Sequence, residues 1–123
     1  MSRGKGWFGV DLDGTIAFYD GYKGNVIGEP IPKMVERVKR WIEKGHNVKI
    51  MTARVSSKDA ESPEQLAEIR TMIEDWTEEH IGTRLEVTNE KDYKMIELWD
   101  DRCVQVIPNT GEPVRMKEER KEL

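Results

Sequence analysis

The chain has 123 residues, which is the size of one domain with a single hydrophobic core. Its 20 basic and 24 acidic side chains give a formal charge of −4, so binding of nucleic acid through overall charge is not indicated, and only a local basic patch would serve. Neither a secretion signal nor an apolar run of roughly eighteen residues is visible. The single cysteine, Cys103, cannot form an internal disulfide, and we expect it to be buried in a cytoplasmic protein that does not bind a membrane.

The first predicted element is a short apolar strand over residues 7–10, which ends in two carboxylates. Asp11 and Asp13 lie on either side of Leu12. In open α/β sheets, ligands bind beyond the carboxyl ends of the strands, so this position favours a functional pair of carboxylates. An ordinary turn is the alternative, because Asp and Gly are common turn residues.

A loop, a helix and a second strand follow. The segment 17–32 is rich in Gly and Pro, which predicts an ordered loop or small hairpin over the end of the first strand. Apolar residues at helical spacing, with Pro32 at the start and Gly45 after a basic last turn, predict a helix. Residues 48–51 are a short strand that leads into Thr52.

The second half of the chain repeats this alternation. Ser62, Pro63 and Gln65 match an N-cap, a first-position proline and a capping box, and Gly82 marks the end of the helix that they begin. Further strands are predicted at 85–88, 95–99 and 103–107.

Strands alternating with helices predict a three-layer, Rossmann-like α/β fold: a mainly parallel five-stranded sheet with helices on both faces. We expect one domain over 1–123. Its core should lie in about 7–107, and 112–123 should be a charged tail that is helical or partly disordered.

Polar residues gather at the predicted ends of four strands. They are Asp11 and Asp13, then Thr52, then Lys91 and Lys94, and finally Asp100 and Asp101. A turn, a cap or a solvated charge would explain each one alone. Together they favour a site, because the carboxyl ends of parallel strands meet at one edge of the sheet.

These residue types fit one chemistry. Several carboxylates at one point repel one another unless a cation lies among them, and a few hard oxygen ligands suit Mg²⁺. A hydroxyl and an ammonium can bind the oxygens of a phosphate beside the metal. One carboxylate can act as a nucleophile and another as a general acid and base, so the combination indicates phosphoryl transfer.

In the order of these motifs the chain resembles the haloacid dehalogenase-like (HAD) hydrolase superfamily, most of whose members are Mg²⁺-dependent phosphatases. The resemblance covers about 7–107. It rests on Asp11-Leu12-Asp13-Gly14-Thr15-Ile16, on Thr52-Ala53-Arg54, on a lysine and on Asp100-Asp101.

The resemblance implies a role for each matching residue. Asp11 would be the nucleophile and a metal ligand, and Asp13 would be the general acid and base and offer its main-chain carbonyl to the metal. Thr52 would hydrogen-bond the transferred phosphoryl group, with Ala53 and Arg54 beside it in the substrate site.

For the lysine and for the last metal ligand, the resemblance leaves two candidate residues each. Lys91 is preferred to Lys94 as the lysine that neutralises charge, because it follows the third predicted strand more closely. Asp100, with Asp101 close by, would complete the Mg²⁺ site, and which of the two binds the metal directly is left open.

The intervals between the motifs are too short for the cap domain that many family members carry, so the resemblance is to small capless phosphatases with at most a flap over 18–29. An open site suits a phosphate on a large substrate, such as a nucleic-acid end, or a second subunit that serves as a lid. The run 96–102 resembles compact nucleotidase-type and phage-encoded relatives, which implies a nucleotide or polynucleotide phosphate.

Two other readings stay open. One is a non-catalytic interaction domain that keeps the HAD fold, since a fold does not prove an activity. The other is a receiver-like domain that accepts a phosphoryl group. The receiver is disfavoured because its adjacent acids come first and its lysine last, whereas here a lysine precedes the final acids.

Overall fold

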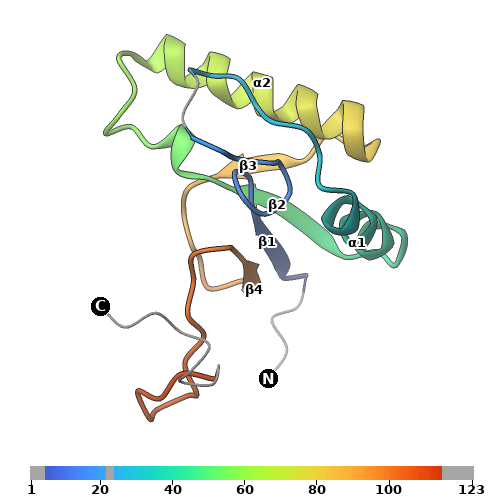
Figure 1. Cartoon of the computed structure of the whole chain (residues 1–123), viewed down its shortest axis with the longest axis vertical. Coiled ribbons are helices and arrows are strands. Elements are labelled where there is room, and N and C mark those ends of the chain that lie inside the picture. Colours follow the sequence, from blue (N-terminus) through green and yellow to red (C-terminus); the bar gives the residue numbers. More distant parts are fainter. Residues whose placement is uncertain (1–4, 22–23, 115–123) are drawn as a thin grey trace.

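The computed structural model describes residues 5–21 and 24–114, which form a parallel sheet of four strands and two α-helices (Figure 1). The strands are β1 (Trp7–Asp11), β2 (Asn47–Met51), β3 (Glu86–Thr88) and β4 (Met95–Trp99), in the order β3-β2-β1-β4. The helices are α1 (Pro32–Glu43) and α2 (Pro63–Ile81), and a 3-10 turn, η1, covers Ala53–Val55. The predicted mixed α/β, Rossmann-like arrangement is therefore present in a smaller form.

Strand β1 is one of the two inner strands of the sheet and sets the position of the site. It pairs in parallel with β2 on one side and with β4 on the other. Asp11 lies opposite Met51, and Val10 lies opposite Trp99. The last residues of β1, β2 and β4 are thus nearly level with one another, so the residues that follow these three strands lie at one edge of the sheet.

The helices begin and end where local chemistry dictates. Helix α1 has Pro32 in its first turn, and Met34, Val35 and Val38 form its buried side. Helix α2 is capped by Ser62, whose hydroxyl accepts a hydrogen bond from the Gln65 amide at 3.0 Å.

At the other end of α2, the chain turns sharply into β3. Gly82 adopts a left-handed conformation with φ of 92° and closes the helix. The fully buried Thr77 hydroxyl donates to the Glu74 carbonyl and accepts from the Leu85 amide, so it ties the helix to the chain that enters β3.

The expected placement of helices on both faces of the sheet is wrong. Helices α1 and α2 contact each other, and their buried side chains belong to one core cluster. The chain steps from β1 to β2 to β3 in one direction, and two right-handed connections in the same direction place both helices on the same face.

The chain returns across the sheet from β3 to β4 through residues 89–94, which contain no helix. This segment is tied to the start of β1: the Trp7 indole Nε1–H donates to Asp92 Oδ1 at 2.9 Å, and the Trp7 amide donates to the Lys94 carbonyl at 3.0 Å. Trp7 is only 3% exposed. The crossover therefore covers Trp7 on the second face without adding a helix there.

The predicted fifth strand over 103–107 is also wrong, and so is the expected burial of Cys103. The segment leaves the sheet after β4 and folds back on itself as a hairpin away from the helices (Figure 1). The Val114 amide donates to the Gln105 carbonyl at 2.9 Å, and the Ile107 amide donates to the Glu112 carbonyl at 2.8 Å. All of residues 103–107 are exposed, because their backbone pairs with 112–114 and not with the edge of β4.

Residues 112–114 thus belong to this hairpin, and the rest of the predicted charged tail, 115–123, lies outside the described residues. Within the described ranges, the intervals that follow β1 and β2 hold loops and the η1 turn but no folded cap. No helix among the described residues is long and apolar enough to cross a membrane.

Candidate functional site

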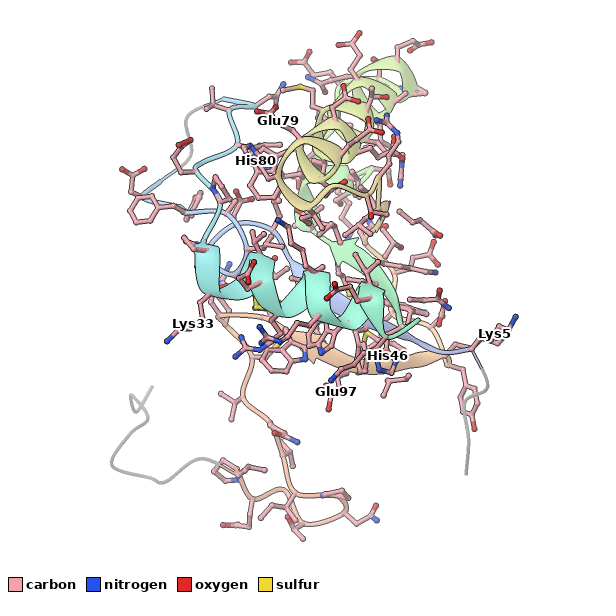
Figure 2. The ribbon with its side chains drawn as sticks, turned by 90° about the vertical axis from the view of Figure 1, so that its right-hand side faces the viewer. Lys5, Lys33, His46, Glu79, His80 and Glu97 are labelled. Atoms are coloured by element: carbon pink, nitrogen blue, oxygen red, sulfur yellow. The ribbon has the colours of Figure 1, made fainter. Side chains whose placement is uncertain are left out.

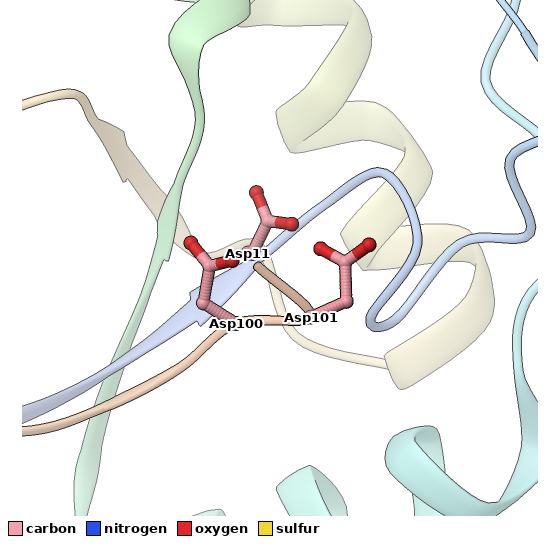
Figure 3. Close-up of side chains that lie close together, drawn as sticks. All are labelled: Asp11, Asp100 and Asp101. Carbon is pink, nitrogen blue, oxygen red and sulfur yellow. The ribbon is translucent and has the colours of Figure 1, made fainter. Parts of the chain in front are cut away.

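Three carboxylates converge at the carboxyl edge of the sheet. Asp11 ends β1, while Asp100 and Asp101 directly follow β4 (Figure 3). One oxygen from each lies within 4.8 Å of the others, and the three side chains project to the same side of the ribbon. The sheet register brings them together across about ninety positions of the sequence, as the strand-end pattern predicted.

The electrostatics of this trio are unfavourable without a cation. Burial, a hydrogen bond with Asp101, and the charges of Asp100, Asp101 and Asp13 raise the pKa of Asp11 from 3.8 to about 7. Like charges that face one another in a partly desolvated place favour protonation, and a bound cation would relieve the same repulsion. The trio offers hard oxygen donors and open access on the side of Asp101, which suits a hydrated Mg²⁺.

Two residues of the turn after β1 hold the trio in place. The Thr15 hydroxyl lies 3.4 Å from Asp11 Oδ2 and accepts a hydrogen bond from the Asp101 amide at 3.0 Å, so it links the ends of β1 and β4. Gly14 has φ of 89°, and a Cβ there would collide with the Asp101 carboxylate. The sequence motif contained both residues, but their role depends on the approach of a loop far away in the chain.

Thr52 lies beside the trio and is well fixed. It follows β2, is 5% exposed, and donates its amide to the Thr88 carbonyl at 2.9 Å. Its hydroxyl oxygen accepts from the Arg54 amide at 3.1 Å and caps η1. The hydroxyl proton is not used in that bond, so it can be donated to a ligand in the pocket.

Asp13 lies outside the trio and is paired with Arg54. Arg54 Nε donates to Asp13 Oδ2 and Arg54 Nη2 donates to Asp13 Oδ1, both at 2.8 Å. The expected substrate-site residue Arg54 therefore reaches the site, but in this structure it holds the expected general acid.

The two candidate lysines lie at different places. Lys91 borders a hollow next to the main pocket together with Asp100 and Cys103. Lys94 borders a separate hollow at the opposite end of the strands, near Lys5 and Trp7. This placement favours Lys91 over Lys94 as a residue that can act on a ligand at the trio.

The carboxylates, Thr52 and Arg54 share a pocket of about 490 Å³ at the edge of the sheet, and neither Lys91 nor Lys94 is among its lining residues. Besides the expected Asp11, Asp13, Thr52, Ala53, Arg54, Asp100 and Asp101, it is lined by Tyr19, Met51, Asn89, Leu98 and Arg102. Tyr19 and Asn89 were missed from the sequence because both lie in loops, where no periodicity marks which side chains face inward.

Both histidines are engaged elsewhere. The His46 ring lies 5.2 Å from that of Phe8 at the end of α1, and the His80 ring lies 4.8 Å from that of Trp76 near the end of α2 (Figure 2). Neither lines the pocket of the carboxylates, so among the described residues the potential metal ligands there are oxygen donors.

Comparison with known protein families and with curated proteins finds no match. One solved structure is similar in fold, a conserved protein of Bacteroides thetaiotaomicron. It aligns with a TM-score of 0.52 over 85% of this chain and 82% of its own, at 24% sequence identity. At that identity the likeness concerns the fold alone.

Proposed function

We propose that this protein is a Mg²⁺-dependent phosphatase of the HAD-like type that hydrolyses phosphate monoesters through an aspartyl-phosphate on Asp11. The observation that carries the proposal is the convergence of Asp11, Asp100 and Asp101 in one pocket with Asp13 and Thr52. The raised pKa of Asp11 supports it: burial is the main cause, the hydrogen bond with Asp101 and the neighbouring carboxylates add to it, and a divalent cation would favour the ionised form.

The residues divide the chemistry between them. A carboxylate oxygen of Asp11 attacks phosphorus and the bond to the ester oxygen breaks, while Asp13 gives that oxygen a proton. In the second half-reaction Asp13 takes a proton from the attacking water, inorganic phosphate leaves, and the Asp11 carboxylate is regenerated. Thr52 would donate to a phosphoryl oxygen, and Lys91 would offset negative charge from beside Asp100.

Asp11, Asp100 and Asp101, with the main-chain carbonyl of Asp13, would hold the cation. Bound Mg²⁺ would supply charge neutralisation at the phosphoryl oxygens and keep Asp11 ionised.

The pocket favours a phosphate carried on a substrate larger than itself. It lies open at the edge of the sheet, and no cap covers it in the described part of the chain. A nucleotide or a phosphorylated end of a nucleic acid fits this description, and a second subunit could serve as the lid that the chain lacks.

The test is release of phosphate from p-nitrophenyl phosphate, from nucleotides and from 3′- or 5′-phosphorylated oligonucleotides, with Mg²⁺ or with EDTA. We expect metal-dependent turnover that is lost in Asp11→Asn. Turnover that is unchanged in Asp11→Asn would refute the mechanism. Phosphorylation without release would favour the receiver-like alternative.

A non-catalytic interaction role is the second candidate, and one observation favours it. The hairpin after β4 exposes several apolar side chains, with Val104 at 45%, Val106 at 49% and Val114 at 53% exposure. Mg²⁺ binding without turnover on the whole panel would move the assignment in this direction.

A further inference from the structure

The Arg54 guanidinium joins the Asp13 carboxylate in the pocket to the loop between β1 and α1. Besides the two bonds to the Asp13 carboxylate, Arg54 Nη2 donates to the Val26 carbonyl at 3.0 Å, and Nη1 donates to the Asn25 carbonyl at 3.2 Å. The Arg54 side chain is only 13% exposed and that of Asp13 is 21% exposed. One planar group therefore contacts both the proposed acid and the backbone of the loop between β1 and α1.

This arrangement leaves Arg54 little capacity for a substrate. A guanidinium has about five N–H donors. The bonds to Asp13, Asn25 and Val26 occupy four of them. A residue that bound the phosphate directly would need two donors aimed into the pocket, so the observed contacts favour a structural link over a phosphate ligand.

The backbone at Arg54 is held at both ends of the η1 turn. Thr52 caps the η1 turn by accepting from the Arg54 amide, and Val55, at 2% exposure, anchors the other end of the turn in the core. Arg54 thus projects from a fixed base. The partner that can shift is the loop, in which Asn25 and Val26 are exposed.

The loop is held at both sides of this contact. The Phe18 amide donates to the Glu29 carbonyl at 2.8 Å, and the Trp76 indole donates to the Gly28 carbonyl at 3.2 Å. Arg54, which lines the pocket, adds two bonds to the loop at the carbonyls of Asn25 and Val26.

We propose that Arg54 is a positioning residue that couples the docking of the 25–26 loop to the orientation of the Asp13 carboxylate. When the loop carbonyls and Asp13 are both bound, the carboxylate is held in one orientation. When Arg54 loses its bonds to the loop carbonyls, its guanidinium holds the Asp13 carboxylate less firmly, and the loss of Asp13 loosens the loop in the same way. This inference rests on the proposed function for the catalytic meaning of Asp13, but the coupling itself can be measured without turnover.

The first experiment measures hydrogen exchange of amides in peptides covering 24–31, in Arg54→Lys and in Asp13→Asn. Lysine keeps the charge but cannot make a two-pronged contact. We expect exchange to rise about tenfold in Arg54→Lys and to a similar degree in Asp13→Asn, because each breaks a charged, hydrogen-bonded pair. The double variant should exchange no faster than the faster single variant. Unchanged exchange in Asp13→Asn, or additive effects in the double variant, would overturn the coupling.

Arg84→Lys is the matched control. Arg84 also pairs with carboxylates, those of Glu74, Asp75 and Glu78, but it lines the separate hollow at the opposite end of the strands. Its variant should leave exchange in 24–31 and turnover unchanged.

The second experiment measures kinetics of Mg²⁺-dependent phosphate release. In Arg54→Lys we expect kcat to fall about 10- to 100-fold with KM within about twofold, because a misoriented acid slows proton transfer and leaves binding intact. A raised KM at unchanged kcat would make Arg54 a substrate ligand and overturn the proposal. If the parent protein turns over no substrate, the proposed function fails, while the exchange experiment still decides the coupling.

Discussion

Gly14 shows how one residue supports the carboxylate trio, and it leads to a prediction with an internal control. Gly14 and Gly45 both have left-handed backbone, with φ of 89° and 87°. A Cβ at Gly14 would collide with the Asp101 carboxylate, whereas a Cβ at Gly45 would meet nothing within 4 Å. Each alanine variant should lose about 1 kcal/mol from the conformation alone.

Only Gly14→Ala should also displace Asp101 and weaken Mg²⁺ binding by about tenfold or more. Calorimetric titration measures the Mg²⁺ affinity of each variant, and urea unfolding measures its loss of stability. Equal Mg²⁺ affinities for the two variants would contradict the contact between Gly14 and Asp101.

The raised pKa of Asp11 predicts the pH dependence of stability in the metal-free protein. The pKa is about 7 in the folded chain against an ordinary 3.8, so between these values the folded state holds a proton that the unfolded state has released. The stabilisation from Asp11 is therefore complete below about pH 4 and is lost as the pH rises through about 7. When unfolding is measured in EDTA between about pH 4 and pH 7, the free energy of unfolding should decline with rising pH in the parent protein and decline less in Asp11→Asn. The same slope in both proteins would contradict the assignment.

Residue-scale features of the site were only partly predictable. The carboxylates at the strand ends and Thr52 could be read from the sequence, because strand termini place side chains by a simple rule. The pairing of Arg54 with Asp13 could not be read, since it depends on the direction of a side chain 41 residues away in the chain. The hydrogen bond from the Asp101 amide to the Thr15 hydroxyl could not be predicted for the same reason.

At the scale of elements, helix α2 depends on the cap at its start. The Ser62 hydroxyl accepts from the Gln65 amide, and Gln65 Oε1 accepts in turn from the Glu61 amide at 2.5 Å, one residue earlier than a capping box would have it. We expect Ser62→Ala to lower the free energy of unfolding by about 1 kcal/mol with little change in Mg²⁺ affinity. Urea denaturation checks this, with Ser57→Ala in the exposed loop before the helix as control. Equal losses in the two variants would contradict the role of the cap.

Most of the helices and strands, but not all of them, could be predicted from the sequence. Both helices and the first four strands were predicted within a residue or two at each end, because caps, prolines, glycines and periodicity act locally. The fifth strand failed because residues 103–107 have the apolar pattern of a strand, and pattern alone does not say which backbone a strand pairs with. The side of the sheet on which the helices lie could not be predicted either, since it depends on the order of all the strands and not on a local sequence signal.

At the scale of the whole molecule, the carboxylate trio joins two adjacent strands of the sheet, so a cation bound there should stabilise the fold. At a Mg²⁺ concentration of about 100 times Kd, linkage predicts about 2.7 kcal/mol of stabilisation. Thermal unfolding should therefore show a higher Tm with Mg²⁺ in the parent and a much smaller shift in Asp11→Asn. Asp59→Asn, in the exposed loop before α2, should keep the full shift. An equal shift in Asp11→Asn would place the bound cation elsewhere.

The whole fold also explains why the site is open. Both helices lie on one face, the second face is crossed by residues 89–94, and the hairpin after β4 extends away from the helices (Figure 1). Among the described residues, the loop between β1 and α1 borders the pocket through Tyr19, and Arg54 binds this loop at the Val26 carbonyl. Shielding of the reaction from water is thus expected to come from the substrate, from this loop or from another subunit.

The most direct measurement is to trap the covalent intermediate. The protein is mixed with a phosphorylated substrate and Mg²⁺ and quenched in acid, and its peptides are analysed by mass spectrometry. We predict an added phosphoryl group on the peptide that contains Asp11, absent with EDTA and absent in Asp11→Asn. Metal-dependent turnover with the phosphoryl group on another residue would contradict the role of Asp11 as the nucleophile.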